Sequence, residues 1–488
     1  MKRIKSVLAI MALTMLTGCN GEVKIDSYIK TLPPIFPDYT NVTVPPNISP
    51  LNFSMPDSCE ISSLRAVFVS GNKRLIVKDE NGQIALSNSK WKMLKRASSK
   101  IIVTIQAKKD DKWIEYSPFT LNIANDSIDS YIVYRLIEPG YETWNEMGIY
   151  QRNLEDFEQS AIITNKMTAY GCMNCHSFCK NSPEKMLFHM RSDYGGTYIV
   201  SNNRVKKLNT KTPQTISALV YPSWHPSGNY IAFSVNNTKQ MFHTTDKNRI
   251  EVFDNASDVV VYDVKKDEIV SSALLMSDGA FETFPTFSPD GKRLYFCSAD
   301  SLDIPAKYDK VKYSLCSISF DEKTGAFGDV VDTLYNAHEG KSVSFPRVSP
   351  DGKYLMFTLS AYGNFSIWHK DADLYLANLK SKKISSLKEL NSEDTESYHS
   401  WSSNGRWVVF SSRRVNGLYT HPFIAYFDKN GKAHKPFLLP QKDKDYYAYL
   451  MKSYNIPEFV KGKVDIDQYN TSQLAKKDKG IDLKFRVN

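Results

Sequence analysis

The residues best suited to chemistry form one short motif, CMNCH, at positions 172–176. Its Cys-x-x-Cys-His spacing is that of covalent haem c attachment. In such a motif, two thiols add across the two vinyl groups of one haem, and the neighbouring imidazole ligates the iron. We therefore expect Cys172 and Cys175 to attach a haem c and His176 to bind its iron. Met190 is a candidate for the sixth iron ligand.

Two other interpretations of these cysteines stay open. An exported protein can form a structural disulfide, here between Cys172 or Cys175 and Cys179. Zinc is the second alternative, because three thiolates and an imidazole, from these cysteines and His189, are ligand types that suit zinc. The same histidine is also the alternative to Met190 as the sixth iron ligand.

The elements around the motif are predicted by an internal repeat. Four segments share it: ALVYPSWHPSGNYIAFSV (218–235), ETFPTFSPDGKRLYFCS (282–298), VSFPRVSPDGKYLMFTLS (343–360) and ESYHSWSSNGRWVVFSSRR (396–414). The Ser-Pro-Asp-Gly core predicts a type I turn, because Pro presets φ and Gly accepts a positive φ. A second strand pair follows each turn, so every unit has the four strands of a propeller blade.

The cysteine motif aligns with the same repeat. Three segments share the position: CHSF (175–178), FPTF (284–287) and YHSW (398–401). Residues 170–209 are thus predicted to form a first, degenerate blade, in a propeller of about five blades over residues 170–440. The alignment also gives His176 a structural alternative, since His399 takes the matching position without cysteines.

These units resemble the TolB-type β-propeller repeat over residues 218–440. The resemblance implies the fold and leaves the activity open, because propellers have many functions. The whole chain is also similar to a group of Bacteroidota-type lipoproteins, in which a Cys-x-x-Cys-His-Ser-Phe segment precedes TolB-like blades. The segment SYNIPEF (453–459) is shared with that group.

Oligogalacturonate lyases resemble this fold too, and they use histidines around a metal at the channel mouth. That resemblance implies a metal-dependent polysaccharide lyase as an enzymatic alternative, with His225, His369, His399 and His421 as available histidines. The sequence contains neither a Gly-x-Ser-x-Gly nucleophile elbow nor a phosphate-binding Gly-x-x-x-x-Gly-Lys motif. We therefore favour a binding or scaffold protein that carries one covalent haem c for electron transfer or redox sensing, with a haem-free periplasmic interaction module as the alternative, and we assign no catalytic residue.

The remaining segments predict an all-β fold with a β-sandwich-like domain before the TolB-like propeller. Residues 20–56 are Pro-rich and read as a tether, and residues 57–138 contain short β-type runs separated by turn residues. Residues 139–169 are a connecting segment, with a short helix expected near 153–160, and residues 441–488 are a tail. Closure of the propeller would need strands from both ends of the chain or from the connecting segment.

Residues 1–19, MKRIKSVLAIMALTMLTGC, predict export, because a basic stretch precedes a short apolar run. The ending resembles the bacterial lipobox, which implies that Cys19 is diacylated and anchors the protein to a membrane. No Asp follows this cysteine, so we expect the outer membrane, facing the periplasm. Export is compatible with haem, since cytochrome c maturation takes place outside the cytoplasm.

The composition sets outer limits on the function. Of 488 residues, 42% are hydrophobic and 24% charged, which is typical of globular proteins and excludes collagen, coiled-coil and mostly disordered chains. The net charge of +9 comes without a long Lys/Arg block, so no nucleic-acid partner is expected. The expected partners are the membrane, through the lipid anchor, and a protein of the cell envelope.

Overall fold

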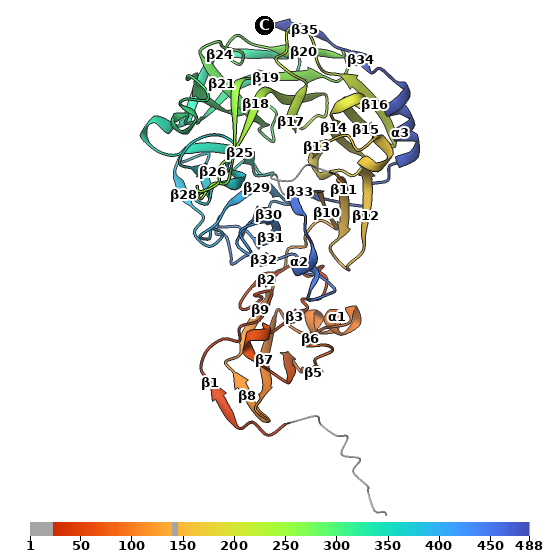
Figure 1. Ribbon diagram of the computed structural model, residues 1–488, viewed down its shortest axis with the longest axis vertical. Coiled ribbons are helices and arrows are strands. Elements are labelled where there is room, and N and C mark those ends of the chain that lie inside the picture. The colour runs from red at the N-terminus through yellow and green to blue at the C-terminus, as the bar shows by residue number, and fades with distance from the viewer. Residues whose placement is uncertain (1–22, 139–144, 488) are drawn as a thin grey trace, which may run out of the picture.

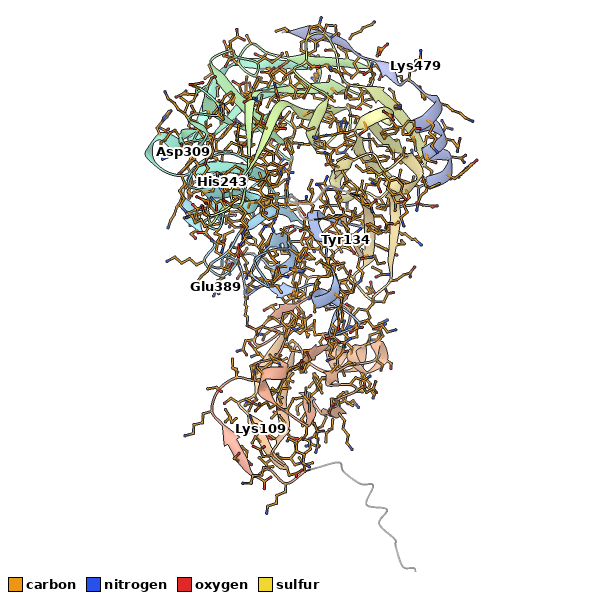
Figure 2. All side chains as sticks on the ribbon, viewed as in Figure 1. Lys109, Tyr134, His243, Asp309, Glu389 and Lys479 are labelled. Atoms are coloured by element: carbon orange, nitrogen blue, oxygen red, sulfur yellow. The ribbon has the colours of Figure 1, made fainter. Side chains whose placement is uncertain are left out.

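The computed structural model describes residues 23–138 and 145–487. A ring of radially arranged sheets lies beside a smaller N-terminal β domain, and side chains fill the spaces between the sheets (Figures 1 and 2). The signal segment and Cys19 lie outside the described residues. No helix in the described part of the chain has both the length and the apolar character needed to cross a bilayer.

The N-terminal domain is built on one seven-stranded sheet with a helix packed against it. The strands of that sheet are β1 (Ser27–Ile29), β8 (Lys112–Tyr116), β7 (Lys100–Lys109), β4 (Ser63–Ser70) and β5 (Lys73–Lys78), with β9 (Phe119–Ile123) and β2 (Thr43–Val44) joined to it through β7. The helix is α1 (Asn88–Ala97), and β3 (Phe53–Ser54) pairs with β6 (Gln83–Ile84). Ser87 caps α1, its hydroxyl accepting from the Lys90 N–H.

Six four-stranded antiparallel blades form the ring, numbered 1 to 6 in chain order. Blade 1 contains, from the axis outwards, β33 (Ser453–Val460), β10 (Tyr131–Ile137), β11 (Gly148–Asn153) and β12 (Gln159–Thr164). Blade 2 contains β13 (Met173–Phe178), β14 (Lys185–Met190), β15 (Gly196–Ser201) and β16 (Arg204–Asn209). Blade 3 contains β17 (Leu219–Trp224), β18 (Tyr230–Phe242), β19 (Ile250–Asp263) and β20 (Glu268–Ser271).

The other three blades follow without interruption. Blade 4 contains β21 (Ala280–Phe287), β22 (Arg293–Asp300), β23 (Ser314–Asp321) and β24 (Ala326–Tyr335). Blade 5 contains β25 (Ser342–Val348), β26 (Tyr354–Ser360), β27 (Asp373–Asn378) and β28 (Ile384–Ser386), and blade 6 contains β29 (Glu396–Trp401), β30 (Trp407–Ser412), β31 (His421–Tyr426) and β32 (Phe437–Leu438). The C-terminal region adds α2 (Tyr446–Tyr449), α3 (Gln468–Lys477), β34 (Ile481–Asp482) on blade 2 and β35 (Lys484–Val487) on blade 3.

The all-β fold with a propeller is confirmed, but the propeller has six blades where the sequence predicted about five. The additional blade combines residues 131–164 with β33 from near the C-terminus, so strands from both sides of the repeats close the ring. Residues 153–160, where a short helix was expected, instead connect the paired strands β11 and β12. Blade 1 lacks the Ser-Pro-Asp-Gly turn, which explains why the repeat did not reveal it.

The predicted Ser-Pro-Asp-Gly turns are present in blades 4 and 5. In blade 4, the Ser288 hydroxyl donates to Asp290 Oδ1 at 2.6 Å and accepts from the Arg293 N–H at 3.0 Å. Gly291 and Gly352 have φ of 74° and 69°, in the left-handed region that Gly enters without a steric penalty. The serine, the aspartate and the glycine therefore each have a defined role in joining the two inner strands.

The N-terminal domain packs on blade 6, and the two share one hydrophobic core. Trp407 of β30 is fully buried there, and its Nε1 donates to the Asp126 carbonyl at 3.1 Å. The Ser403 hydroxyl donates to Asp129 Oδ1 at 2.6 Å. Because Asp129 lies two residues before β10, these contacts fix the point where the chain enters the propeller.

Candidate functional site

Six equivalent residues, one from each blade, form a ring at the propeller axis. Each innermost strand contains a β-bulge, and the bulged residue has a φ between 45° and 54°. The six are Cys175, Tyr221, Phe284, Phe345, Tyr398 and Ile456. Centroids of the four aromatic rings follow one another at 4.5–4.6 Å. These six residues are called the axial ring below. Four of them, Cys175, Tyr221, Tyr398 and Ile456, line a cavity on one side of the ring, and residues that follow the ring positions line a cavity on the other side.

The larger cavity, of about 770 Å³, is at the channel mouth, and its described lining is rich in positive charge. Its cationic side chains are Arg135, Arg191, Lys239 and Arg413, and the carboxylate among the described lining residues is Glu138. Glu138 is paired with Lys452, whose Nζ lies 3.5 Å from Oε1. The mouth cavity therefore has an excess of positive charge.

Arg135 is one of the two buried cations of this cavity, with 8% of its surface exposed, and the other is Arg413. Arg135 lies on β10, and its Nη1 donates to the Met173 carbonyl at 3.1 Å. Its Nε is buried without a hydrogen-bond partner, and no ion pair joins it to another described residue. A buried guanidinium without a carboxylate is costly to the fold, so its place beside a cavity is informative.

Arg413 directly follows β30 of blade 6, the neighbour of blade 1 in the ring. Its Nε donates to the Ile367 carbonyl at 2.8 Å, and its guanidinium carbon lies 3.4 Å from the ring centroid of Trp368. Stacking on an aromatic face fixes the guanidinium plane, and its Nη1 also donates to the Leu418 carbonyl. Arg135 lies in no sequence motif, and the repeat segment 396–414 contains Arg413 without indicating its contact with Trp368.

Polar atoms of the lining add hydrogen-bonding capacity. The Oδ1 atoms of Asn174 and Asn236 are buried without a donor. His189 is neutral at pH 7, because burial and the nearby Arg191 lower its pKa to about 3, and its Nδ1 lies 3.2 Å from Thr197 Oγ1. The cavity thus offers cations and acceptors to a ligand.

The two cysteines of the Cys-x-x-Cys-His motif also lie on this cavity. Cys172 is partly exposed, and Cys175 is buried at the axial-ring position that aromatic residues take in other blades. Burial raises the pKa of the Cys175 thiol. The thiol is therefore protonated at neutral pH and is a poor nucleophile.

His176 is separated from this cavity. Its ring is 1% exposed, does not line the mouth cavity, and lies against the backbones of Val133 and Ile456. Burial, with a smaller effect of Arg135, lowers its pKa to about 3, and neither ring nitrogen forms a hydrogen bond of ordinary geometry. An unpaired buried imidazole could bind iron, but here backbone groups of β10 and β33 lie against its ring.

The other proposed iron ligand, Met190, does not line the mouth cavity either, although His189 and Arg191 on either side of it do. It is 2% exposed and packs in a hydrophobic cluster with Met173 and Val133. The residues of the motif therefore do not fit a haem bound by Cys172, Cys175 and His176 in this conformation. The haem stays a prediction from sequence that this geometry does not favour.

The disulfide and zinc alternatives share one difficulty. Cys179 lies beyond the other end of β13, in the core between blades 2 and 3, with its Sγ 3.9 Å from the His225 carbonyl. Cys172, Cys175 and His189 instead line the mouth cavity. The six cysteines of the described chain are unpaired, and no group of three metal-ligating side chains is found among the described residues.

The histidines considered for a lyase are spread over the propeller. His225 Nε2 bonds to the Gly291 carbonyl (3.1 Å), His399 Nε2 to the Met356 carbonyl (2.9 Å), and His369 Nε2 to Glu251 (2.9 Å). His421 is fully buried, which lowers its pKa to about 4. Each has a packing role, and the described residues bring none of them to a shared metal position.

Comparisons with known proteins add little to this geometry. No protein-family model matches the sequence, and no curated protein does. Solved structures with similarity include a puromycin-hydrolyzing peptidase of Mycobacterium tuberculosis (TM-score 0.33, 12% identity, 82% of this chain and 57% of that chain), an ancestral GH74 enzyme (0.35, 10%, 64% and 47%) and Porphyromonas gingivalis dipeptidyl peptidase 4 (0.27, 12%, 64% and 52%).

The chain spans about half of the length of these proteins. Similarity at this level carries no argument about function. The fold and the site define the class of this molecule by themselves: it is a six-bladed β-propeller protein with a positively charged cavity at its channel mouth.

Proposed function

We propose that this chain is a binding protein whose propeller takes up a small anionic ligand at the channel mouth. The observation that carries the proposal is Arg135, a buried guanidinium that lines the cavity without a carboxylate partner. A carboxylate or phosphate supplied by a ligand would offset the cost of burying this charge, through a charge-assisted hydrogen bond.

The lining of the mouth cavity also favours a ligand that has hydrogen-bond donors next to its negative charge. The unpaired Oδ1 atoms of Asn174 and Asn236 accept hydrogen bonds from hydroxyl or amide groups. A cavity of about 770 Å³ is of the size that small-molecule sites have. An acidic sugar and an acidic peptide share this chemistry, which is a carboxylate beside hydroxyl or N–H donors.

Matched pairs of probes test the proposal. Galacturonate and galactose differ in the carboxylate, as do N-acetyl-Glu-Glu and N-acetyl-Gln-Gln. We expect calorimetry to show that the anionic member of at least one pair binds at least about tenfold more tightly, as a charge-assisted bond of about 1.5–3 kcal/mol implies. Equal affinity within both pairs would contradict the proposal, and the pair that responds identifies the ligand class.

A lipid anchor is part of the same proposal. Acylation at Cys19 would place the propeller at the outer membrane, facing the periplasm, where it would meet its ligand or an envelope protein. Radiolabelled palmitate should be incorporated into the native chain and should be absent from Cys19→Ala. A native chain that takes up no label would remove this part of the proposal.

A further inference from the structure

The second cavity, of about 470 Å³, lies on the other side of the axial ring. The residue two positions after each axial-ring residue lines it, so one residue from every blade faces this cavity. In chain order of the strands that carry them, these residues are Ser177, Ser223, Thr286, Arg347, Ser400 and Glu458. Four of the six are small hydroxyl residues, and blades 5 and 1 carry opposite charges instead.

Arg347 and Glu458 are not paired with each other. Ser400 of blade 6 lies between them in the ring, and their hydrogen bonds go to backbone atoms of other residues. The Arg347 Nη1 donates to the Pro346 carbonyl at 3.0 Å, which leaves Nε and Nη2 without a bond to the described residues. Glu458 Oε2 accepts from the Phe178 N–H at 3.2 Å, and Oε1 accepts from none of the described residues.

The walls around this pair are aromatic. Trp224 and Trp401 line the cavity, and each uses its Nε1 to donate to a backbone carbonyl of the neighbouring blade, at 3.3 Å and 3.2 Å. Their indole N–H groups are thus satisfied, and their ring faces present apolar surface. Two charges of opposite sign that face one cavity, with apolar walls, match a ligand that carries both an ammonium and a carboxylate.

We propose that this second cavity binds a short peptide with free termini, whose carboxylate pairs with Arg347 and whose ammonium pairs with Glu458. The Ser and Thr hydroxyls at the other four positions supply donors and acceptors for the peptide bond. The apolar side chains of the peptide lie against the two indole rings. This site is separate from the mouth cavity, because the axial ring lies between them.

The charge state of Glu458 makes the site sensitive to pH. Burial raises the pKa of this carboxyl to about 7, against the opposing effect of Arg347 and of the Phe178 N–H. The other charged groups at the cavity are Lys180 and Lys461, both exposed. Below pH 7, Glu458 gains a proton and loses its attraction for an ammonium, so binding of the peptide weakens as the pH falls from 8 to 6.

Calorimetry with leucyl-leucine tests the proposal. We expect N-acetyl-leucyl-leucine and leucyl-leucinamide, each with one terminal charge removed, to bind about tenfold more weakly or worse. Arg347→Gln and Glu458→Gln should show comparable losses, whereas Arg204→Gln and Glu393→Gln, both exposed and distant from the cavity, should bind as the native chain does. The native affinity for leucyl-leucine should fall at pH 6, whereas that for N-acetyl-leucyl-leucine should not.

The analogues keep the test valid if either variant fails to fold, since they use the native chain. Equal binding of all three peptides, or no binding of leucyl-leucine at millimolar concentration, would overturn the proposal.

Discussion

His176 of blade 2 and His399 of blade 6 occupy equivalent positions, directly after the bulged residue of the innermost strand. Pro occupies this position in the other four blades. Both histidines are buried, and burial lowers the pKa of each to about 3. One of the two belongs to a Cys-x-x-Cys-His motif and the other does not, so a structural role accounts for both.

The structural role of His176 predicts a pH-dependent effect of its replacement. Its folded pKa of about 3 lies below the usual unfolded value of about 6.5, so acidification below pH 6.5 protonates the unfolded state first and lowers the free energy of unfolding. The slope for one such group approaches about 1.4 kcal/mol per pH unit. The deficit of His176→Leu relative to the native chain should therefore be about 2 kcal/mol smaller at pH 5 than at pH 7.

Urea denaturation at the two pH values measures this change. The matched control is His338→Leu, because the His338 side chain is 68% exposed and should show no such difference. A His176→Leu deficit that is the same at both pH values would argue against a buried, neutral imidazole at this position.

The same geometry makes a prediction about haem. The protein should be produced and exported in cells that also express the cytochrome c maturation machinery. We expect its mass to equal that of the polypeptide plus its lipid. We also expect no Soret band after denaturation and acid-acetone extraction. The reason is that β10 and β33 enclose His176 away from the cavity that Cys172 and Cys175 line. A haem-sized mass increase that disappears in Cys175→Ser would show that the motif is used for attachment.

Substitution by alanine should destabilise the fold to different degrees at two glycines in equivalent turns. Gly291→Ala and Gly352→Ala both place a side chain at a φ near 70°, which costs about 1–2 kcal/mol. A methyl group on Gly291 would in addition lie 2.2 Å from His225 Nε2, whereas no atom lies within 4 Å of one on Gly352. Thermal unfolding should show Gly291→Ala to be the more destabilised.

The double variant Gly291→Ala with His225→Ala separates the clash from the backbone strain. If the imidazole is the obstacle, the two substitutions should be non-additive by about 0.5–3 kcal/mol. Additive costs in this cycle would show that the close approach to His225 has no energetic consequence.

Because β33 closes the ring, a substitution in this strand should lower the free energy of unfolding strongly, although β33 lies outside the repeats. Tyr454 of β33 is fully buried, with its ring centroid 4.5 Å from that of Tyr134 in β10, a residue labelled in Figure 2. Tyr454→Ala should lower the free energy of unfolding by about 3–5 kcal/mol, as large-to-small core changes do. Hydrogen exchange should quicken first in β10 and β11, and unchanged exchange there would contradict the closure.

Much of this architecture could be predicted from the sequence, because the repeats carry local turn chemistry. The Ser-Pro-Asp-Gly segments and the alignment of residues 175–178 with 284–287 and 398–401 correspond to equivalent positions in the structure. Blade 1 was missed because residues 131–164 have no such turn. A signal was present, however, since Ile456-Pro457 repeats the apolar-Pro pair found in Tyr221-Pro222 and Phe284-Pro285.

The site was harder to predict, for a physical reason. Arg135 and Arg413 come from different blades, and only ring closure brings them to one cavity. Arg135 is a single arginine in a strand without a local pattern, and the repeat that contains Arg413 does not indicate that the two line one cavity. The Cys-x-x-Cys-His motif, which does give one, has its thiols at the cavity and its imidazole elsewhere.

The central claim, that the channel mouth attracts anions, can be measured without knowing the ligand. Cys172 is partly exposed and lines the mouth cavity, so its thiol reports the local potential. The rates of its modification by anionic sulfonatoethyl and cationic trimethylammonioethyl methanethiosulfonate should be compared with those of free 2-mercaptoethanol, with Cys172→Ser identifying the site.

Positive charge in the cavity should favour the anionic reagent at Cys172 by about tenfold or more relative to free thiol. Arg135→Gln and added salt should both reduce that preference, whereas Arg204→Gln should not. A rate ratio at Cys172 equal to that of the free thiol, and unchanged in Arg135→Gln, would contradict the account.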